Sequence, residues 1–154
     1  MTQHDDKFVK ILVRFYNNVL DEWTVETMWA ETVDKVKGLY KIDNIPFYAS
    51  IASDDVVFAE YDETEKMLTY RETVEYSGNS LVQVVIMDKS VLTNDIRDIF
   101  NAMGCKSEKF KEGYFVLEIL AQKDYGLIKQ KLNELQDNGI IDYAEPILSD
   151  NHRY

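Results

Sequence analysis

GLYKIDNIPFYASIASDDVVFAEYDE, residues 38–63, is the stretch on which the fold of the first half of the chain depends. Apolar runs stand near both of its ends, and its middle holds Pro46 among turn-forming polar residues. Proline fixes the backbone angle φ, whereas β-branched and aromatic side chains favour sheets. The stretch therefore predicts two short strands, residues 39–42 and 54–61, with a loop between them that closes back into the second, buried strand.

The segments on either side of this stretch alternate between two faces, as strands do. Residues 23–30 alternate and are rich in Trp, Val and Thr, and residues 67–76 follow a charged turn. Residues 7–16 alternate too, and one of their faces is entirely apolar: Val9, Ile11, Val13 and Phe15. Short strands of this kind cannot each bury a face alone, so we expect them to bend into a small antiparallel sheet or barrel.

The second half of the chain mixes strand patterns with helix patterns. Thr93 is the predicted N-cap of a helix that Gly104 ends, and a second helix is predicted from about Asp124 to Asn138. The order strand, helix, strand, strand, helix, strand is typical of a ferredoxin-like βαββαβ unit. The predicted strands are residues 81–87, 105–110, 114–119 and 140–144.

Together these patterns predict an α+β fold in two domains, a small bent antiparallel sheet or barrel at 1–78 and a ferredoxin-like βαββαβ unit at 79–154. The chain has 154 residues, of which 45% are hydrophobic, and this is enough apolar material for a buried core. Its one cysteine, Cys105, excludes a disulfide within the chain. Neither a leader segment nor a run of about 18 apolar residues is present, so we expect a cytoplasmic protein without a membrane partner.

The chain is acidic, and the excess charge is uneven. Seventeen basic and 28 acidic residues give a net charge of −11. Residues 1–78 carry eight basic and 16 acidic residues, a net charge of −8, whereas residues 79–154 carry −3. Negative charge repels nucleic-acid backbones and attracts cationic proteins. We therefore expect no nucleic-acid partner, and we expect a protein partner with a basic surface to bind the first half.

Residue types that carry out catalysis or hold metals are scarce. The two histidines, His4 and His152, lie near the chain ends, where we expect them to be exposed to solvent. Cys105 has no positioned histidine beside it, so we interpret it as a core or edge-strand residue. Asp54 and Glu60 would serve as an acid and a base only if the fold brought them together in a cleft. We therefore expect no enzyme activity, no catalytic residues, no cofactor and no metal site.

Carboxylates and one tryptophan are the best candidates for a partner-binding surface. The carboxylates between residues 54 and 65 lack the spacing and the glycine of a calcium loop, which leaves solvated loop charge or a docking surface as their interpretation. Trp23 follows Asp21 and Glu22, and an aromatic side chain with a charged rim is typical of a binding anchor, although core packing also explains it. The hypothetical contact residues are Asp21, Glu22, Trp23, Asp54, Asp55, Asp62, Glu63 and Glu65.

Three segments carry a resemblance that covers nearly the whole chain. They are RFYNNVLDEWTVETMWAE at 14–31, the opening stretch with its DNIPFYA and DDVV runs at 43–49 and 54–57, and TYRETVEYSGNSLVQVV at 69–85. The chain resembles a family of small bacterial proteins known only as a domain of unknown function. The resemblance implies cytosolic proteins that are not established as enzymes, some of them similar to immunity proteins encoded beside secreted polymorphic toxins. It implies no role for any single residue.

Two functions from different classes remain open. The first is an immunity protein that neutralises a cognate toxin by covering its active or target-binding surface, because acidic charge speeds association with a basic partner and aromatic anchors hold the complex. The alternative is a small-molecule-sensing or regulatory domain, because βαββαβ units often pair edge to edge and hold ligands between them. No glycine-rich phosphate loop supports this alternative. A ligand that raises the melting temperature by several degrees would favour it.

Overall fold

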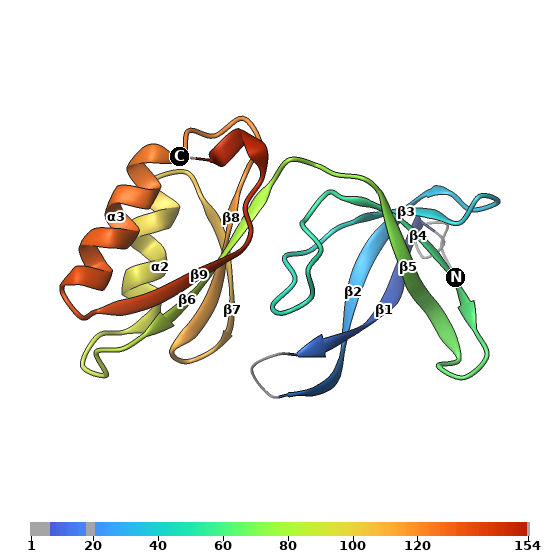
Figure 1. Cartoon of the computed structure of the whole chain (residues 1–154), viewed down its shortest axis with the longest axis horizontal. Helices are drawn as coiled ribbons and strands as arrows, with labels where there is room; N and C mark the ends of the chain where they lie inside the picture. The colour runs from blue at the N-terminus through green and yellow to red at the C-terminus, as the bar shows by residue number, and fades with distance from the viewer. Residues whose placement is uncertain (1–6, 18–20, 154) are drawn as a thin grey trace. The chain divides into compact units, whose positions relative to one another are not determined.

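The computed structural model describes residues 7–17 and 21–153. The chain divides into two compact units, residues 1–77 and 78–154 (Figure 1). The first unit is a closed barrel of five strands, and the second contains a four-stranded antiparallel sheet and two helices. The fold class is α+β, as the sequence predicts.

The strands of the barrel are β1 Phe8–Asn17, β2 Glu22–Asp34, β3 Leu39–Ile42, β4 Val56–Asp62 and β5 Met67–Glu75. Consecutive strands pair antiparallel around the barrel. The barrel closes where β1 meets β5 in a parallel bridge between Leu12 and Thr69. Each strand predicted in this half of the chain overlaps one of these five.

Alternation along the strands decides which side chains enter the barrel. In β1, the apolar face described above points inward: Ile11 and Val13 are buried, and Val9 and Phe15 pack against the same core. The side chains that face them come from the other strands and from the loop before β4, namely Met28, Ala30, Tyr40, Ile42, Ala49, Ile51, Val57 and Ala59. The apolar face that alternation predicts in β1 therefore lines the barrel core, although Leu12, on the other face of this strand, is buried as well.

The loop between β3 and β4 folds against the barrel core. Its position is fixed by Glu26 on β2, whose carboxylate accepts hydrogen bonds from three successive backbone N–H groups. The donors are Phe47 at 2.6 Å, Tyr48 at 3.1 Å and Ala49 at 2.8 Å. Hydrogen bonds to an ionised acceptor are stronger than neutral ones, so one side chain holds a loop segment that has no regular structure of its own.

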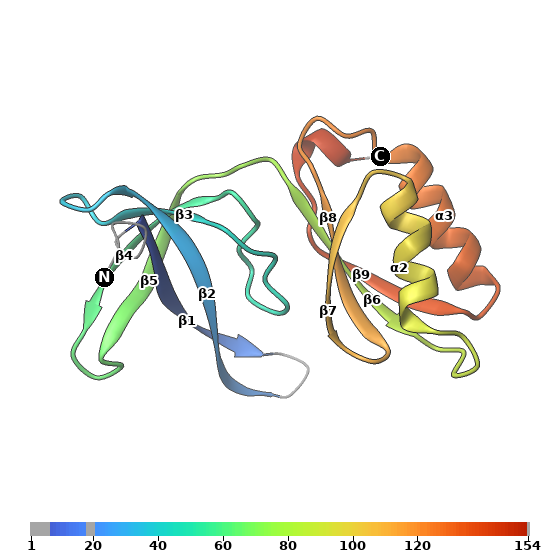
Figure 2. The same ribbon diagram turned by 180° about the vertical axis from the view of Figure 1, so that it is seen from behind.

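The second unit starts with β6 Ser80–Ile86, α2 Thr93–Ala102, β7 Lys106–Lys111 and β8 Tyr114–Ile119. It ends with α3 Gly126–Asp137, β9 Ile141–Ile147 and the short 3₁₀ helix η1 Asp150–His152. The strand order in the sheet is β7-β8-β6-β9, and all neighbours are antiparallel. Figure 2 shows both helices on the same side of this sheet. Within the described residues, no helix is long and apolar enough to cross a membrane.

The core of the second unit lies between the sheet and its helices. Phe100 from α2 and Leu132 from α3 pack there against Val84 and Phe115 of the sheet. Thr93 differs from its predicted role as N-cap, because it is the first residue of α2 and its side chain does not cap the helix. Its hydroxyl instead accepts a hydrogen bond from the backbone of Gly113 at 2.8 Å, which ties the helix to the turn between β7 and β8.

His152 is buried, which corrects the expectation of an exposed chain end. Its Nδ1 lies 2.6 Å from the hydroxyl of Ser80, and its Nε2 lies 2.9 Å from the carbonyl oxygen of Leu120. The Ser80 hydroxyl also accepts a hydrogen bond from the backbone of Ser149 at 2.9 Å. The imidazole therefore provides hydrogen-bond partners for two polar groups, the Ser80 hydroxyl and the Leu120 carbonyl. These hydrogen bonds hold the end of the chain against β6. His4 lies outside the described residues.

Candidate functional site

The β1–β2 hairpin carries a pair of exposed aromatic side chains close to its tip. Tyr16 and Trp23 lie opposite each other in the antiparallel register. Their rings meet edge to face with centroids 5.7 Å apart, and Trp23 is 64% exposed. An edge-to-face contact positions both rings while it leaves most of the tryptophan accessible to a partner.

Two carboxylates adjoin this aromatic pair. Asp21 lies in a turn with φ of 54°, a left-handed conformation that Asp adopts more readily than most residues. It accepts a hydrogen bond from the hydroxyl of Tyr16, and this bond raises the pKa of the tyrosine. Glu22 begins β2 and is exposed. Three of the predicted contact residues, Asp21, Glu22 and Trp23, therefore lie together, beside a tyrosine that the sequence does not single out.

The exposed face of the hairpin continues from its tip toward the barrel. Val25 and Trp29, at alternate positions after Trp23, are 46% and 49% exposed. In β1, Arg14 lies opposite Val25, and Lys10 lies opposite Trp29 with its Nζ 5.1 Å from the centre of the indole ring. We name this surface the outer hairpin face; it consists of Lys10, Arg14, Tyr16, Trp23, Val25 and Trp29.

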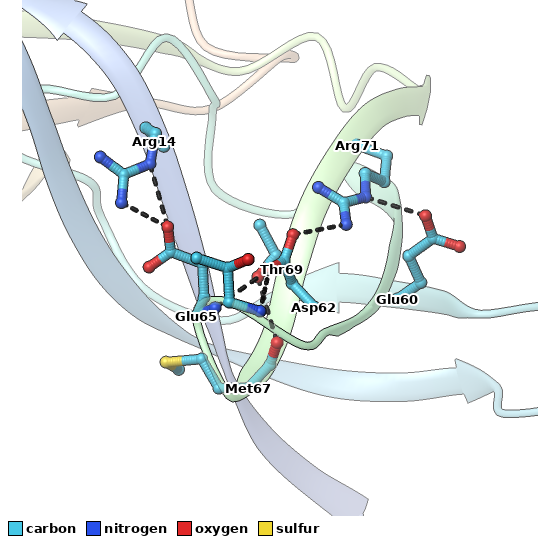
Figure 3. Close-up of polar contacts among 8 residues, drawn as sticks. Arg14, Glu60, Asp62, Glu65, Met67, Thr69 and Arg71 are labelled. Carbon is cyan, nitrogen blue, oxygen red and sulfur yellow. Dashed lines mark hydrogen bonds and ion pairs between the residues drawn. The ribbon is translucent and has the colours of Figure 1, made fainter.

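The turn between β4 and β5 holds most of its charge in internal contacts (Figure 3). Asp62 accepts hydrogen bonds from the backbone of Thr64 at 2.8 Å and of Glu65 at 2.9 Å. Arg71 bridges two carboxylates, Glu60 and Asp62, at 2.9 Å each. The backbone hydrogen bond from Glu65 and the contact with Arg71 hold the pKa of Asp62 below its usual range.

Glu65 connects this turn to the hairpin. Its carboxylate pairs with the guanidinium of Arg14, which lies two residues before Tyr16 on the same face of β1. Glu63 is exposed at the tip of the turn. Of the predicted acidic turn, Asp62 and Glu65 are therefore occupied by arginines of the same unit, and the turn presents less free negative charge than its sequence suggests.

Asp55 is buried, which corrects its predicted place in a docking surface. Its side chain is 3% exposed and accepts hydrogen bonds from the backbone N–H groups of Ala52 at 3.0 Å and Ser77 at 2.8 Å. Burial raises the pKa of this carboxyl above its ordinary value, against the opposing effect of these hydrogen bonds. The exposed Asp54 precedes β4 whereas Asp62 ends it, so about 20 Å of strand separates the two predicted acidic groups.

Most of β4 separates Asp54 from Glu60, the two residues that the sequence suggested as an acid and a base. Asp54 precedes β4, whereas Glu60 lies near the end of this strand and is paired with Arg71. Cys105 is buried, and burial raises its pKa to about 11, which keeps it a thiol at neutral pH. In the part of the chain that the structure describes, no group of three or more His, Cys, Asp or Glu side chains is arranged to hold a metal ion.

Comparison with known proteins gives a family and a fold. Residues 26–143 match the family described as Domain of unknown function (DUF4265). No curated protein matches the chain. A solved structure described as a novel crystal structure of a hypothetical protein from Neisseria gonorrhoeae is similar, with a TM-score of 0.78 and 24% sequence identity. The similarity covers 91% of this chain and 94% of that chain, and it shows a shared fold.

Proposed function

We propose a function for this chain from the premise that it belongs to the family described as Domain of unknown function (DUF4265). It is an immunity protein, which binds a cognate bacterial toxin and neutralises it by covering the active or target-binding surface of that toxin. Contact is made through the outer hairpin face together with Asp21 and Glu22. The observation that carries this proposal is the Tyr16–Trp23 pair, which stands exposed beside two carboxylates.

The composition of the outer hairpin face supports a protein partner. It brings Tyr16, Arg14 and two tryptophans into one surface, and these residue types carry a large share of the binding energy in protein interfaces. The rings are held in place by neighbours within the hairpin, because Tyr16 contacts Trp23 and Lys10 lies over Trp29. Side chains that are already ordered lose less conformational entropy when a partner binds.

The charge of the chain supports a basic partner. Residues 1–78 carry a net charge of −8, and Asp21 and Glu22 lie next to the exposed indole of Trp23. Opposite net charges on two proteins raise the rate of their association, and charges at the rim of an interface act mainly on this rate. We therefore place the rim of the site at Asp21 and Glu22 and its apolar centre at Trp23.

The proposed contact set is narrower than the sequence suggested. Asp55 takes no part, because its carboxylate is buried and bonded within its own unit. Asp62 and Glu65 are paired with Arg71 and Arg14, so a partner would have to replace those contacts to reach them. Glu63 and Asp54 are exposed and stay in the proposal as outer contacts.

We propose two further details that accompany this function. The second unit is a ferredoxin-like βαββαβ domain, which is supported by its strand order β7-β8-β6-β9 and by two helices that pack on one core. The protein acts in the cytoplasm, where an incoming toxin would meet its target. The charge and the exposed aromatic residues of the first unit support toxin binding by that unit.

The proposal can be tested with the product of the gene that neighbours the gene for this chain, by measuring the growth of bacteria that produce it. Growth should stop when that protein is produced alone and should resume when this chain is produced with it. A Glu22→Gln, Trp23→Ala double variant should protect poorly, because it removes one rim charge and the aromatic centre. Leu127→Ala, at a 67% exposed position on α3, is the matched control and should protect fully.

Two outcomes of this experiment would contradict the proposal. The first is a neighbouring protein that does not slow growth. The second is full protection by the double variant at normal abundance, with a circular dichroism spectrum like that of the unaltered chain. A metabolite that raises the melting temperature of this chain by several degrees, together with the first outcome, would favour a small-molecule-sensing function instead.

A further inference from the structure

Within the part of the chain that the structure describes, one edge of β2 lacks a neighbouring strand over much of its length. β2 pairs with β1 through residues 22–31, but with β3 only through residues 30–34. At Trp29, the backbone N–H donates to Oδ1 of Asn44 at 2.6 Å, and the backbone carbonyl accepts from the N–H of Asp43 at 2.9 Å. The backbone groups of Trp29 therefore face away from β1, toward the side of β2 on which β3 lies.

The direction of backbone groups alternates along a strand, so residues two apart face the same side. Thr27 and Val25 accordingly present their N–H and carbonyl groups on the same side as Trp29. Among residues 7–17 and 21–153, no hydrogen bond joins these groups of Val25 and Thr27 to a partner on that side. The open edge extends from residue 23 to residue 27, about 17 Å of extended chain.

Edge strands of the other sheet carry features that prevent pairing with a further strand. In β7, the carbonyl of Ser107 accepts a hydrogen bond from Arg97 at 3.2 Å, and β9 contains Pro146, which has no N–H. β7 also carries three lysines, namely Lys106, Lys109 and Lys111. The open part of β2 has neither lysine nor proline, and it exposes Trp23 and Val25 instead.

We propose that an extended segment of the partner adds to this edge of β2 as a further strand, hydrogen-bonded to the backbone of Val25 and Thr27. This inference rests on the proposed function and states how the toxin is held. Backbone hydrogen bonds along the edge supply affinity. Every second side chain of the added strand lies on the outer hairpin face, where Trp23, Val25 and Trp29 select for its sequence.

Charge identifies the occupant as a basic segment. Asp21 and Glu22 stand at the open end of the edge, in the half of the chain that carries a net charge of −8. A strand with lysine or arginine at its end would meet these carboxylates. A second copy of this chain is a poor occupant, because it brings a further net charge of −11 to the same place.

Hydrogen exchange and proline substitution test this edge in the complex with the protein encoded beside this one. In the unaltered complex, exchange of the Val25 and Thr27 amides should slow by about tenfold or more relative to the free chain, because each gains an acceptor. Thr27→Pro removes one of these N–H groups at a position where the free protein does not use it. It should weaken binding by about tenfold or more relative to Thr27→Ala, which keeps the N–H.

The outcomes separate this inference from the proposed function. A complex in which the Val25 and Thr27 amides exchange as fast as in the free chain would overturn the inference and leave toxin binding in place, and this readout needs no variant. Thr27→Pro that folds and binds as tightly as Thr27→Ala would overturn it too. A free chain that forms a dimer with these amides protected would make a second copy the occupant. No complex at all would contradict both proposals.

Discussion

At the scale of the residue, Asp55 differs from its neighbour although the two are chemically identical. Its carboxylate joins the backbone of Ala52, three residues away, to that of Ser77, twenty-two residues away. Asp54 is exposed with φ of 66° and stands in the turn before β4. A pair of aspartates in a loop looks like solvated charge in the sequence. Asp55 differs from Asp54 in its burial and in its long-range contact with Ser77, which no local pattern in the sequence encodes.

Asp55→Ala should lower the free energy of unfolding by about 2–4 kcal/mol, because the buried N–H group of Ala52 and the half-buried N–H group of Ser77 lose their acceptor. Glu63→Gln, at an exposed position in the β4–β5 turn, is the control and should change it by less than about 0.5 kcal/mol. Urea unfolding followed by tryptophan fluorescence measures both. Equal stability of Asp55→Ala and the unaltered chain would show that the carboxylate does not hold the loop.

The same residue gives a pH dependence with a definite sign. Burial raises the pKa of Asp55 above 3.8, so the folded state keeps its proton at pH values where the unfolded chain has lost it. The contribution of this group to the free energy of unfolding therefore falls as pH rises from 3.8 through the folded pKa. Unfolding of Asp55→Asn, which does not titrate here, provides the reference. If the free energy of unfolding of the unaltered chain rose with pH relative to that of Asp55→Asn, the sign of the effect would contradict this prediction.

At the scale of the element, β2 combines features that the sequence predicts with features that it does not. Alternation of Trp, Val and Thr predicts the strand and places Trp23 and Trp29 on one face. The same alternation does not tell whether this face meets a core or solvent, because tryptophan suits both. Closure of the barrel decides it by burying Met28 and Ala30 and leaving both indoles exposed. Tyr16 also belongs to the candidate site because of a tertiary contact. It lies opposite Trp23 only through the register in which β1 pairs with β2.

Amide exchange in the free protein should reveal the open edge of β2. Thr24, Glu26 and Met28 direct their backbone toward β1, so their amides should exchange slowly. Val25 and Thr27 should exchange fast, close to the rate of an unstructured peptide. Nuclear magnetic resonance resolves these amides one by one. Uniform protection from Thr24 to Met28 would mean that the edge is already covered in the free chain.

At the scale of the whole molecule, the sequence predicts the class of fold, whereas the details of the site depend on tertiary contacts. In the sequence, alternating strand patterns give way to helix-containing patterns near residue 78, and this change separates the two halves. The structure divides into compact units after residue 77. The net charge of −11 is fixed by composition. Composition does not decide how much of this charge a partner can reach. Arg14 and Arg71 pair with carboxylates in and beside the β4–β5 turn, and Asp55 is buried. The proposed binding of a partner therefore depends on the exposed hairpin residues more than on total charge.

Titration of this chain into a fixed amount of the proposed toxin, with the activity of that toxin as the readout, tests binding by occupation most directly. At toxin concentrations far above the dissociation constant, activity should fall in a straight line and reach zero at one equivalent, whatever the time of incubation. If a small fraction of an equivalent abolished the activity, and the loss increased with time, occupation would be contradicted, because one molecule of this chain would then inactivate many molecules of the toxin. Activity that stays unchanged at several equivalents would contradict binding itself.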